Sequence, residues 1–171
     1  MISEQQPKCA VLGYGSWATA IVKTLTVNHQ HVNWLVLNDD ILQSLEERSL
    51  NVKYLPWCYI DREFIRPSKD INEVVRDVDI VILAMPSAFL TKFLEPLTES
   101  LANKIVVSAV KGIIPGDYLT IVEHMNRYYD VPMKNLAVVT GPSHAEEVGQ
   151  CRLSYLTVAS EDINTAKIVE G

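Results

Sequence analysis

Residues 9–20 read CAVLGYGSWATA. Cys9 to Leu12 are apolar, as in a strand that is buried on both of its faces. Gly13, Gly15 and Ala18 follow at the spacing G-x-G-x-x-A, and a helix is expected to open directly after the second glycine. A short buried strand that leads through two glycines into a helix is typical of the first turn of an α/β protein.

Five more short apolar runs alternate with segments of helical pattern along the chain. These runs are Val32 to Leu37, Ile80 to Ala84, Ile105 to Ala109, Leu136 to Thr140 and Tyr155 to Ala159. Their lack of polar alternation predicts strands that are covered on both faces, and the strand–helix order predicts right-handed crossovers. We therefore expect a doubly wound, mainly parallel Rossmann-type α/β sheet with helices on both faces, whose ligands bind at the carboxyl ends of the strands.

The chain has 171 residues, of which 48% are hydrophobic, and it contains no internal repeat or linker. We expect one domain, spanning residues 1–171. Asn51 to Pro67 interrupts the regular order with prolines, aromatic residues and mixed charge, which predicts an irregular excursion with at most a short strand. Ile168 to Gly171 fall inside an expected helix, so we expect a further domain to follow in the intact protein.

The 21 acidic and 15 basic residues give a net charge of −6, which provides no overall positive field for nucleic acid or an anionic membrane. The sequence has no apolar stretch of about 18 or more residues, which a membrane span would need. The N-terminus also lacks the pattern of a secretory signal. We expect a cytoplasmic protein without nucleic-acid or membrane partners. Cys9, Cys58 and Cys151 lack metal-ligand spacing and are odd in number, which predicts free thiols and no metal site.

The glycine turn itself predicts a phosphate site. Gly13 allows the tight turn, Gly15 lets a diphosphate approach the backbone, and Ala18 is small enough for the helix to pack on the sheet. The free N–H groups at the start of the helix, together with the helix dipole, favour phosphate binding. We expect a dinucleotide such as NAD or NADP in this turn, and the alternative is a purely structural strand-to-helix connection.

The residues leave the choice between the two coenzymes open. About twenty residues after the turn, where NAD enzymes often carry an acid for the ribose 2′-hydroxyl, the second strand ends in Leu37-Asn38-Asp39-Asp40. Asn38 is neutral, and no arginine stands there to receive a 2′-phosphate. Asp39 is equally suited to cap the next helix.

Five motifs, taken together in this order, resemble NAD(P)-dependent glycerol-3-phosphate dehydrogenases. They are Gly13 to Ala20 (GYGSWATA), Asn51 to Pro56 (NVKYLP), Met85 to Phe89 (MPSAF), Lys111 to Ile113 (KGI) and Gly141 to Glu147 (GPSHAEE). The resemblance spans nearly the whole chain and identifies it as similar to the N-terminal cofactor-binding domain of these enzymes.

The resemblance implies a cofactor site that extends beyond Gly13 and Gly15. Its further members are Ser16, Trp17, Asn38, Tyr54, Phe89, Lys111 and Ala145. Ser16 and Trp17 are implied to contact the cofactor phosphates, and Asn38 and Tyr54 to lie near the adenosine end. Asn38 stands where the family commonly has a basic residue, which keeps both NAD and NADP open.

Lys111 is the candidate catalytic and substrate-binding residue. It follows the predicted strand Ile105 to Ala109, which places it at the crevice, where an ammonium group can meet a phosphate or polarise a carbonyl oxygen. The resemblance assigns Gly141 and Ser143 to the glycerol phosphate. Ser143 also suits an N-cap with Glu146 at the capping-box position. His144, alone and without the partners of a catalytic triad, is expected to pack or to lie on the surface.

The activity that the resemblance implies is reversible hydride transfer between NAD(P)H and dihydroxyacetone phosphate. The product is sn-glycerol 3-phosphate, a precursor of phospholipids. The family's proton donor is a lysine of a following helical domain, so we expect this chain alone to bind dinucleotide with negligible turnover, and the full-length protein is compatible with a homodimer.

Two other classes of protein share the glycine fingerprint. A two-domain dehydrogenase acting on a sugar acid or a keto acid should lack the joint Lys-Gly-Ile and Gly-Pro-Ser motifs. A non-enzymatic NADH-sensing domain would have no use for a lysine aimed at a substrate phosphate.

Overall fold

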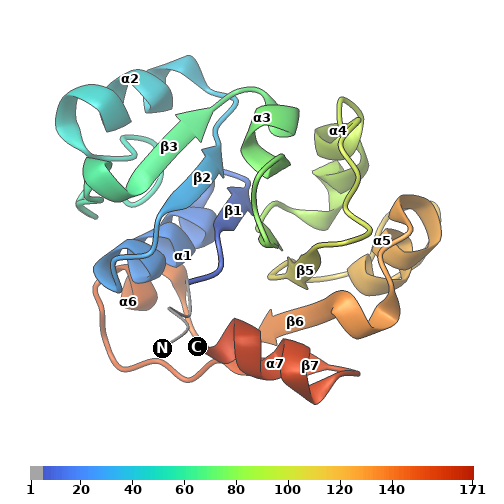
Figure 1. Cartoon of the computed structure of the whole chain (residues 1–171). Helices are drawn as coiled ribbons and strands as arrows, with labels where there is room; N and C mark the ends of the chain where they lie inside the picture. Colours follow the sequence, from blue (N-terminus) through green and yellow to red (C-terminus); the bar gives the residue numbers. More distant parts are fainter. Residues whose placement is uncertain (1–5) are drawn as a thin grey trace, which may run out of the picture.

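A seven-stranded sheet in the order β3-β2-β1-β4-β5-β6-β7 forms the centre of the computed structural model, which describes residues 6–171 (Figure 1). Strands β1 to β6 are parallel, and β7 pairs with β6 in the antiparallel sense. The strands are β1 (Cys9–Leu12), β2 (Val32–Leu35), β3 (Ile65–Ser68), β4 (Ile80–Leu83), β5 (Ile105–Ser108), β6 (Leu136–Thr140) and β7 (Thr157–Ser160). The predicted Rossmann-type α/β class is confirmed.

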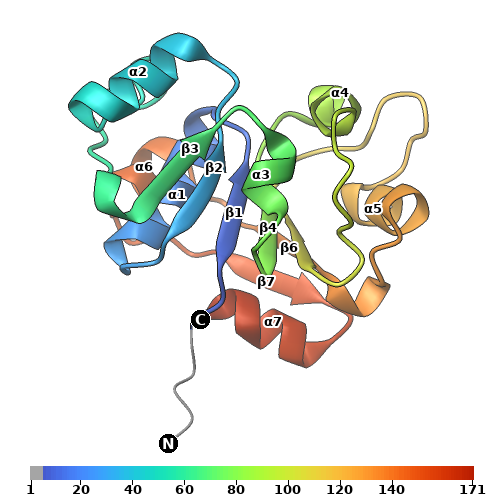
Figure 2. The ribbon, with the colours of Figure 1, turned by 45° about the horizontal axis from the view of Figure 1, so that its top comes forward.

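Helices lie on both faces of the sheet (Figures 1 and 2). The α-helices are α1 (Ser16–Val27), α2 (Asp39–Arg48), α3 (Ile71–Val75), α4 (Leu90–Leu94), α5 (Ile121–Tyr129), α6 (Ala145–Gly149) and α7 (Ile163–Glu170). Three short 3₁₀ helices span Arg62–Phe64, Ser87–Phe89 and Met133–Asn135. Side chains of α3, α4 and α5 pack on one face of the sheet, and side chains of α1 and α2 pack on the other.

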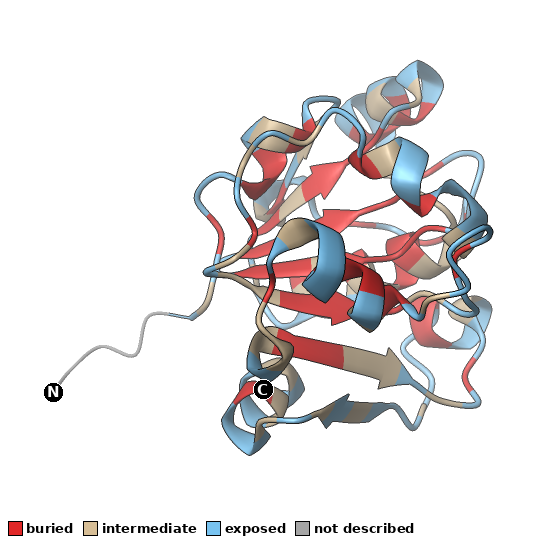
Figure 3. Ribbon diagram, turned by 90° about the vertical axis from the view of Figure 1, so that its right-hand side faces the viewer, coloured by how far each residue is buried: buried red, intermediate tan, exposed pale blue. Residues whose placement is uncertain are grey.

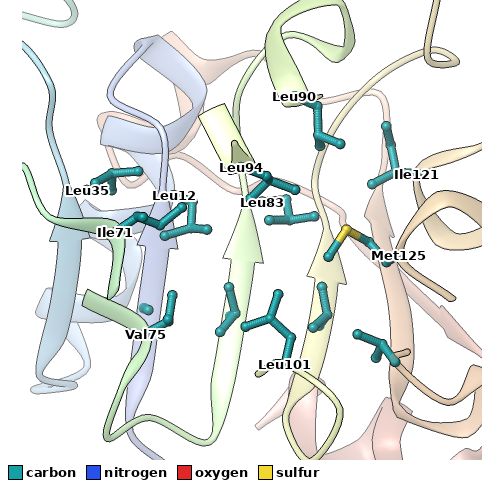
Figure 4. Packing of buried hydrophobic residues seen from close by; sticks show 14 of the residues in the cluster. Leu12, Leu35, Ile71, Val75, Leu83, Leu90, Leu94, Leu101, Ile121 and Met125 are labelled. Atoms are coloured by element: carbon teal, nitrogen blue, oxygen red, sulfur yellow. The ribbon is translucent and has the colours of Figure 1, made fainter. Parts of the chain in front are cut away.

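The alternation of side chains along β1 explains why its sequence carries no polar position. Leu12 points into the core shared with α3, α4 and α5 (Figure 4), whereas Val11 points into the core shared with α1 and α2. Both cores are apolar, so every residue of the strand is apolar and buried. The same two-sided burial colours the central strands almost entirely as buried in Figure 3.

Several strands end earlier at their carboxyl ends than the sequence predicted. The ladder of β2 stops at Leu35 instead of Leu37, and the ladders of β4 and β5 each stop one residue early. Val36 is nevertheless fully buried, and its N–H still bonds to the carbonyl of Ser68 at 2.9 Å. Apolar sequence therefore follows burial, which continues past the last residue of the regular ladder.

The excursion Asn51 to Pro67 contains one short strand, β3, which runs one residue beyond it to Ser68. The expectation for the last strand was wrong in two respects: β7 begins at Thr157 instead of Tyr155, and it does not complete a parallel crossover. Ser143 donates a hydrogen bond to the carbonyl of Tyr155 at 3.2 Å. This contact holds the residues just before β7 beside the carboxyl end of β6. Because β7 starts there and pairs with β6, it runs in the opposite direction.

Candidate functional site

A cleft of about 670 Å³ lies at the carboxyl edge of the parallel strands, where the topology places a ligand. Its walls come from the β1–α1 turn, from the segments after β4, β5 and β6, and from the excursion. The lining residues are Tyr14, Gly15, Ser16, Trp17, Tyr54, Ala84, Met85, Pro86, Ser87, Ala88, Phe89, Phe93, Ala109, Val110, Lys111, Ser143, His144 and Ala145.

Gly13 and Gly15 have different structural roles in the turn after β1. Gly13 has φ +120°, and a Cβ on it would lie 2.3 Å from the carbonyl oxygen of Ala84. The indole of Trp34 also donates to the Gly13 carbonyl at 2.7 Å. Gly15 has an ordinary φ of −74°, and a Cβ on it would have no atom within 4 Å. Gly13 therefore lets the backbone turn against β4, whereas Gly15 leaves open space beside the start of α1.

The N-terminus of α1 presents unsatisfied donors to this space. Gly15 is the N-cap and provides no side chain to cap the helix. Within residues 6–171, no acceptor is recorded for the backbone N–H groups of Ser16, Trp17 and Ala18. These donors and the positive end of a twelve-residue helix suit the two phosphates of a dinucleotide, which can approach because Gly15 has no side chain.

Asn51 ties the excursion to the glycine turn. Its fully buried amide donates to the carbonyl of Tyr14 at 2.9 Å and to the hydroxyl of Thr19 at 2.8 Å. Its side-chain oxygen accepts from the N–H of Tyr54 at 3.1 Å, which holds Tyr54 at the cleft. Sequence reasoning gave Asn51 no role. The available signal was an asparagine opening the NVKYLP motif.

Asn38 lies outside the residues that line the cleft. It is the N-cap of α2, and its side-chain oxygen accepts from the N–H of Ile41 at 3.2 Å. The suggestion that Asp39 caps this helix was wrong, because Asn38 is the last extended residue before it. Asp39 and Asp40 lie in the first turn and pair with Lys69 and Lys53, each at 2.6 Å.

Lys111 lies in the cleft wall just past the end of β5, and its side chain is exposed. Among the described residues no carboxylate forms an ion pair with it. The next residue, Gly112, has φ +99° and comes within 3.3 Å of the Ser87 hydroxyl, measured from the position of an added Cβ. The turn that carries Lys111 is therefore packed against the segment after β4, and its ammonium group remains available to an anion.

The prediction that Ser143 caps the helix after β6 was wrong. His144, not Ser143, is the N-cap of α6, and no side chain caps this helix. Ser143 is buried, and its hydroxyl is donated to Tyr155 instead. A Cβ on Gly141 would lie 2.4 Å from the same Tyr155 carbonyl, so Gly141 packs under the returning chain and does not line the cleft. His144 is exposed at the cleft, which agrees with the surface placement expected for it.

Eight of the eleven expected site residues line this one cleft, and Gly13, Asn38 and Gly141 do not. The eight are Gly15, Ser16, Trp17, Tyr54, Phe89, Lys111, Ser143 and Ala145. Sequence reasoning missed Tyr14 and Phe93, whose rings lie 6.0 Å apart in the same wall. Within residues 6–171, no helix is long and apolar enough to cross a membrane, and no cluster of His, Cys, Asp and Glu could hold a metal ion.

A doubly wound sheet with an open helix N-terminus at its crevice defines a dinucleotide-binding domain of the Rossmann class. The chain belongs to the NAD-dependent glycerol-3-phosphate dehydrogenase N-terminus family, whose model matches residues 8–166.

Curated relatives agree with this assignment, and a solved structure shares the fold. The glycerol-3-phosphate dehydrogenase (NAD(P)+) of Halalkalibacterium halodurans is 32% identical over 163 residues, which cover 94% of this chain and 47% of that protein. The corresponding protein of Streptococcus thermophilus is 31% identical over 170 residues, covering 98% and 49%. The glycerol-3-phosphate dehydrogenase structure from Coxiella burnetii superposes with a TM-score of 0.82 at 24% identity, covering 96% of this chain and 50% of that one. The chain thus spans about half the length of these relatives.

Proposed function

We propose that this chain binds NAD or NADP in the cleft, as the cofactor half of an NAD(P)-dependent glycerol-3-phosphate dehydrogenase. The observation that carries the proposal is the open N-terminus of α1, which faces a cleft lined by eight of the expected site residues. An uncapped helix start beside a glycine with free space is what a diphosphate needs, and a merely structural turn does not need it.

Different residues of the chain bind different parts of the dinucleotide. The N–H groups of Ser16, Trp17 and Ala18 hold the diphosphate, and the helix dipole contributes to its binding. Tyr54, held by Asn51, and the half-exposed ring of Phe89 supply apolar surface in the cleft wall. Asn38 binds the adenosine end of the cofactor. Its side-chain oxygen already caps α2, so its Nδ2 group is the donor that remains for the cofactor.

In the reaction that we propose, dihydroxyacetone phosphate and sn-glycerol 3-phosphate interconvert. The dinucleotide supplies the hydride chemistry when it is bound. Lys111 meets the substrate's phosphate or stabilises charge on the reacting oxygen, because its ammonium group is free and stands at the crevice. Ser143 lines the same cleft in the segment after β6, and Gly141 lies behind this segment, under the returning chain. The proton donor and further substrate contacts lie in the part of the relatives' length that this chain does not span.

Calorimetric titration of the chain with NADH, and separately with NADPH, tests the proposal and ranks the coenzymes. We expect saturable one-to-one binding of at least one of them. In Gly15→Asp we expect the affinity to fall by about tenfold or more, because a carboxylate would face the diphosphate at contact distance. The fold should survive, since aspartate is a favoured N-cap and a Cβ at Gly15 meets no atom within 4 Å.

Asn103→Asp is the matched control for the added charge. Asn103 is exposed in the turn before β5, at the opposite edge of the sheet from the cleft. This variant should bind as the unaltered chain does. Equal affinity of Gly15→Asp and the unaltered chain would contradict the site, and no binding of either dinucleotide by the unaltered chain would contradict the function proposed for it.

A further inference from the structure

Cys58 lies against the end of α6, close to Cys151 in the chain that follows. The Cys58 thiol donates to the carbonyl of Gly149 at 3.6 Å, and a Cβ on Gly149 would lie 3.7 Å from the same sulfur. Cys151 comes two residues later, in the turn that ends α6, where its N–H bonds to the carbonyl of Val148 at 2.9 Å. The buried Cys58 thiol therefore lies against the last residue of α6, and the exposed Cys151 follows two residues further along the chain.

The surroundings of Cys58 change the pKa of its thiol. Burial raises the pKa of Cys58, Lys23 opposes the rise, and Cys151 adds to it.

The backbone at Cys151 is unusual for a cysteine. Its φ of +55° lies in the left-handed region, and the N–H of Arg152 reaches back to the carbonyl of Glu147 at 3.0 Å. This is the position after a helix at which glycine is strongly preferred, because other residues pay a steric cost there. The turn would form more easily with glycine, so its geometry does not account for a thiol at this place.

The cluster around Cys58 is shared with the cleft. Cys58 is buried with Ala20, Leu55 and Val148, and Trp17 and Ala145 pack against this cluster. Trp17 and Ala145 also line the cleft. Helix α6 has Ala145 at one end and Gly149 at the other, so a movement at the thiol end reaches the cleft through only five residues.

We propose that Cys58 and Cys151 form a reversible disulfide that fastens the excursion to the end of α6 and changes the dinucleotide affinity of the cleft. The oxidant is a peroxide. The exposed Cys151 sulfur takes one oxygen from hydrogen peroxide, which leaves a sulfenic acid and releases water. The Cys58 sulfur then loses its proton and attacks the Cys151 sulfur, so the S–S bond forms, the S–O bond breaks and a second water leaves. Both sulfur atoms are oxidised, and one peroxide is reduced to two waters.

The disulfide is tested on the reduced chain, treated with hydrogen peroxide, digested without reductant and analysed by mass spectrometry. We expect a peptide that links Cys58 to Cys151 and that disappears when dithiothreitol is added. Cys58→Ser and Cys151→Ser should each abolish it. Cys9→Ser is the matched control and should form it in full, since Cys9 lies at the start of β1 with its thiol 3.5 Å from the carbonyl of Pro7. Oxidation of Cys151 to sulfinic acid, or only to disulfides between chains, would overturn the disulfide.

The link to the cleft rests on the proposed function and has its own measurement. NADH titration of the cross-linked and the reduced chain should give dissociation constants that differ by about fivefold or more, and peroxide should leave the affinity of Cys58→Ser unchanged. Equal affinities would overturn the coupling to the cleft. Failure of both forms to bind would contradict the proposed function, whereas the linked peptide alone decides the disulfide.

Discussion

Gly13 holds a backbone conformation that an L-residue side chain cannot share cheaply. Its φ is +120°, and a Cβ would lie 2.3 Å from the Ala84 carbonyl oxygen, which belongs to backbone and cannot swing away. We expect Gly13→Ala to lower the free energy of unfolding by roughly 2 to 4 kcal/mol, through backbone strain and overpacking together. Urea unfolding of the chain, followed by circular dichroism, measures this change.

Gly15→Ala is the companion variant for that experiment. Gly15 has φ −74° and open space around its Cβ position, so its replacement should cost less than about 1 kcal/mol. Losses of equal size in the two variants would show that the close approach to Ala84 does not determine the requirement at Gly13.

The same residue scale shows which features of the glycine turn can be predicted from the sequence. The tight turn at Gly13 and the open helix start at Gly15 follow from local rules, because they involve only neighbouring residues. The role of Asn51 does not, since its partners Tyr14 and Thr19 lie more than thirty positions away in sequence. Asn38 and Asp39 were both reasonable caps, and only the backbone angles of the folded chain distinguish them.

Helix α5 buries a histidine whose charge is disfavoured. His124 packs against the rings of Tyr128 and Tyr129, with centroids at 4.8 and 5.9 Å, and its Nδ1 lies 3.5 Å from an Asp117 carboxylate oxygen. That atom makes no hydrogen bond within the described chain, so the aspartate compensates the burial only in part. Burial lowers the pKa of His124, and Asp117 opposes the shift.

The pH dependence follows from the direction of this shift. The unfolded chain takes up the His124 proton at a pH near 6.5, whereas the folded chain does so only at lower pH. The contribution of neutral His124 to stability is therefore complete above about pH 6.5 and is lost as the pH falls toward the folded pKa. We expect His124→Gln to flatten the dependence of the urea midpoint on pH between about 7 and 5.5. His144→Gln, at an exposed histidine, should leave the dependence unchanged, and an unaltered slope in His124→Gln would contradict the assignment.

At the scale of elements, the central strands were predictable because burial on both faces removes polar residues from them. The edge strand β3 was foreseen only as a short strand somewhere in the excursion, since Arg66 and Pro67 break its apolar pattern. The direction of β7 could not be read from its sequence. It depends on the hydrogen bond between Ser143 and Tyr155 and on the packing of Gly141, which are contacts between distant segments.

For the whole molecule, topology makes the location of the cleft predictable. Six parallel strands place their carboxyl ends on one edge, and the segments after β1, β4, β5 and β6 converge there. Order along the chain is enough to forecast this convergence. The shape of the cleft walls is less accessible to sequence reasoning, because it depends on how the excursion and α6 pack against α1.

Residues in and near the cleft wall are exposed to solvent, and this exposure bears on turnover. Phe89 at its wall is 53% exposed, and Ile113, two residues after Lys111, is 49% exposed. Hydride transfer is efficient where water is excluded and where a proton donor stands beside the substrate. Neither Phe89 nor Lys111 is shielded from solvent in this chain.

We therefore expect the 171-residue chain to bind dinucleotide but to oxidise NADH or NADPH with dihydroxyacetone phosphate no faster than buffer does. The absorbance of the reduced coenzyme measures turnover, and a full-length enzyme of the family serves as the positive control. Steady consumption by the chain alone would mean that Lys111 and the residues around it complete the chemistry without a second domain. Binding without consumption would mean that this chain holds the coenzyme, and that closure of the site and proton delivery need the part of the family's enzymes that this chain does not span.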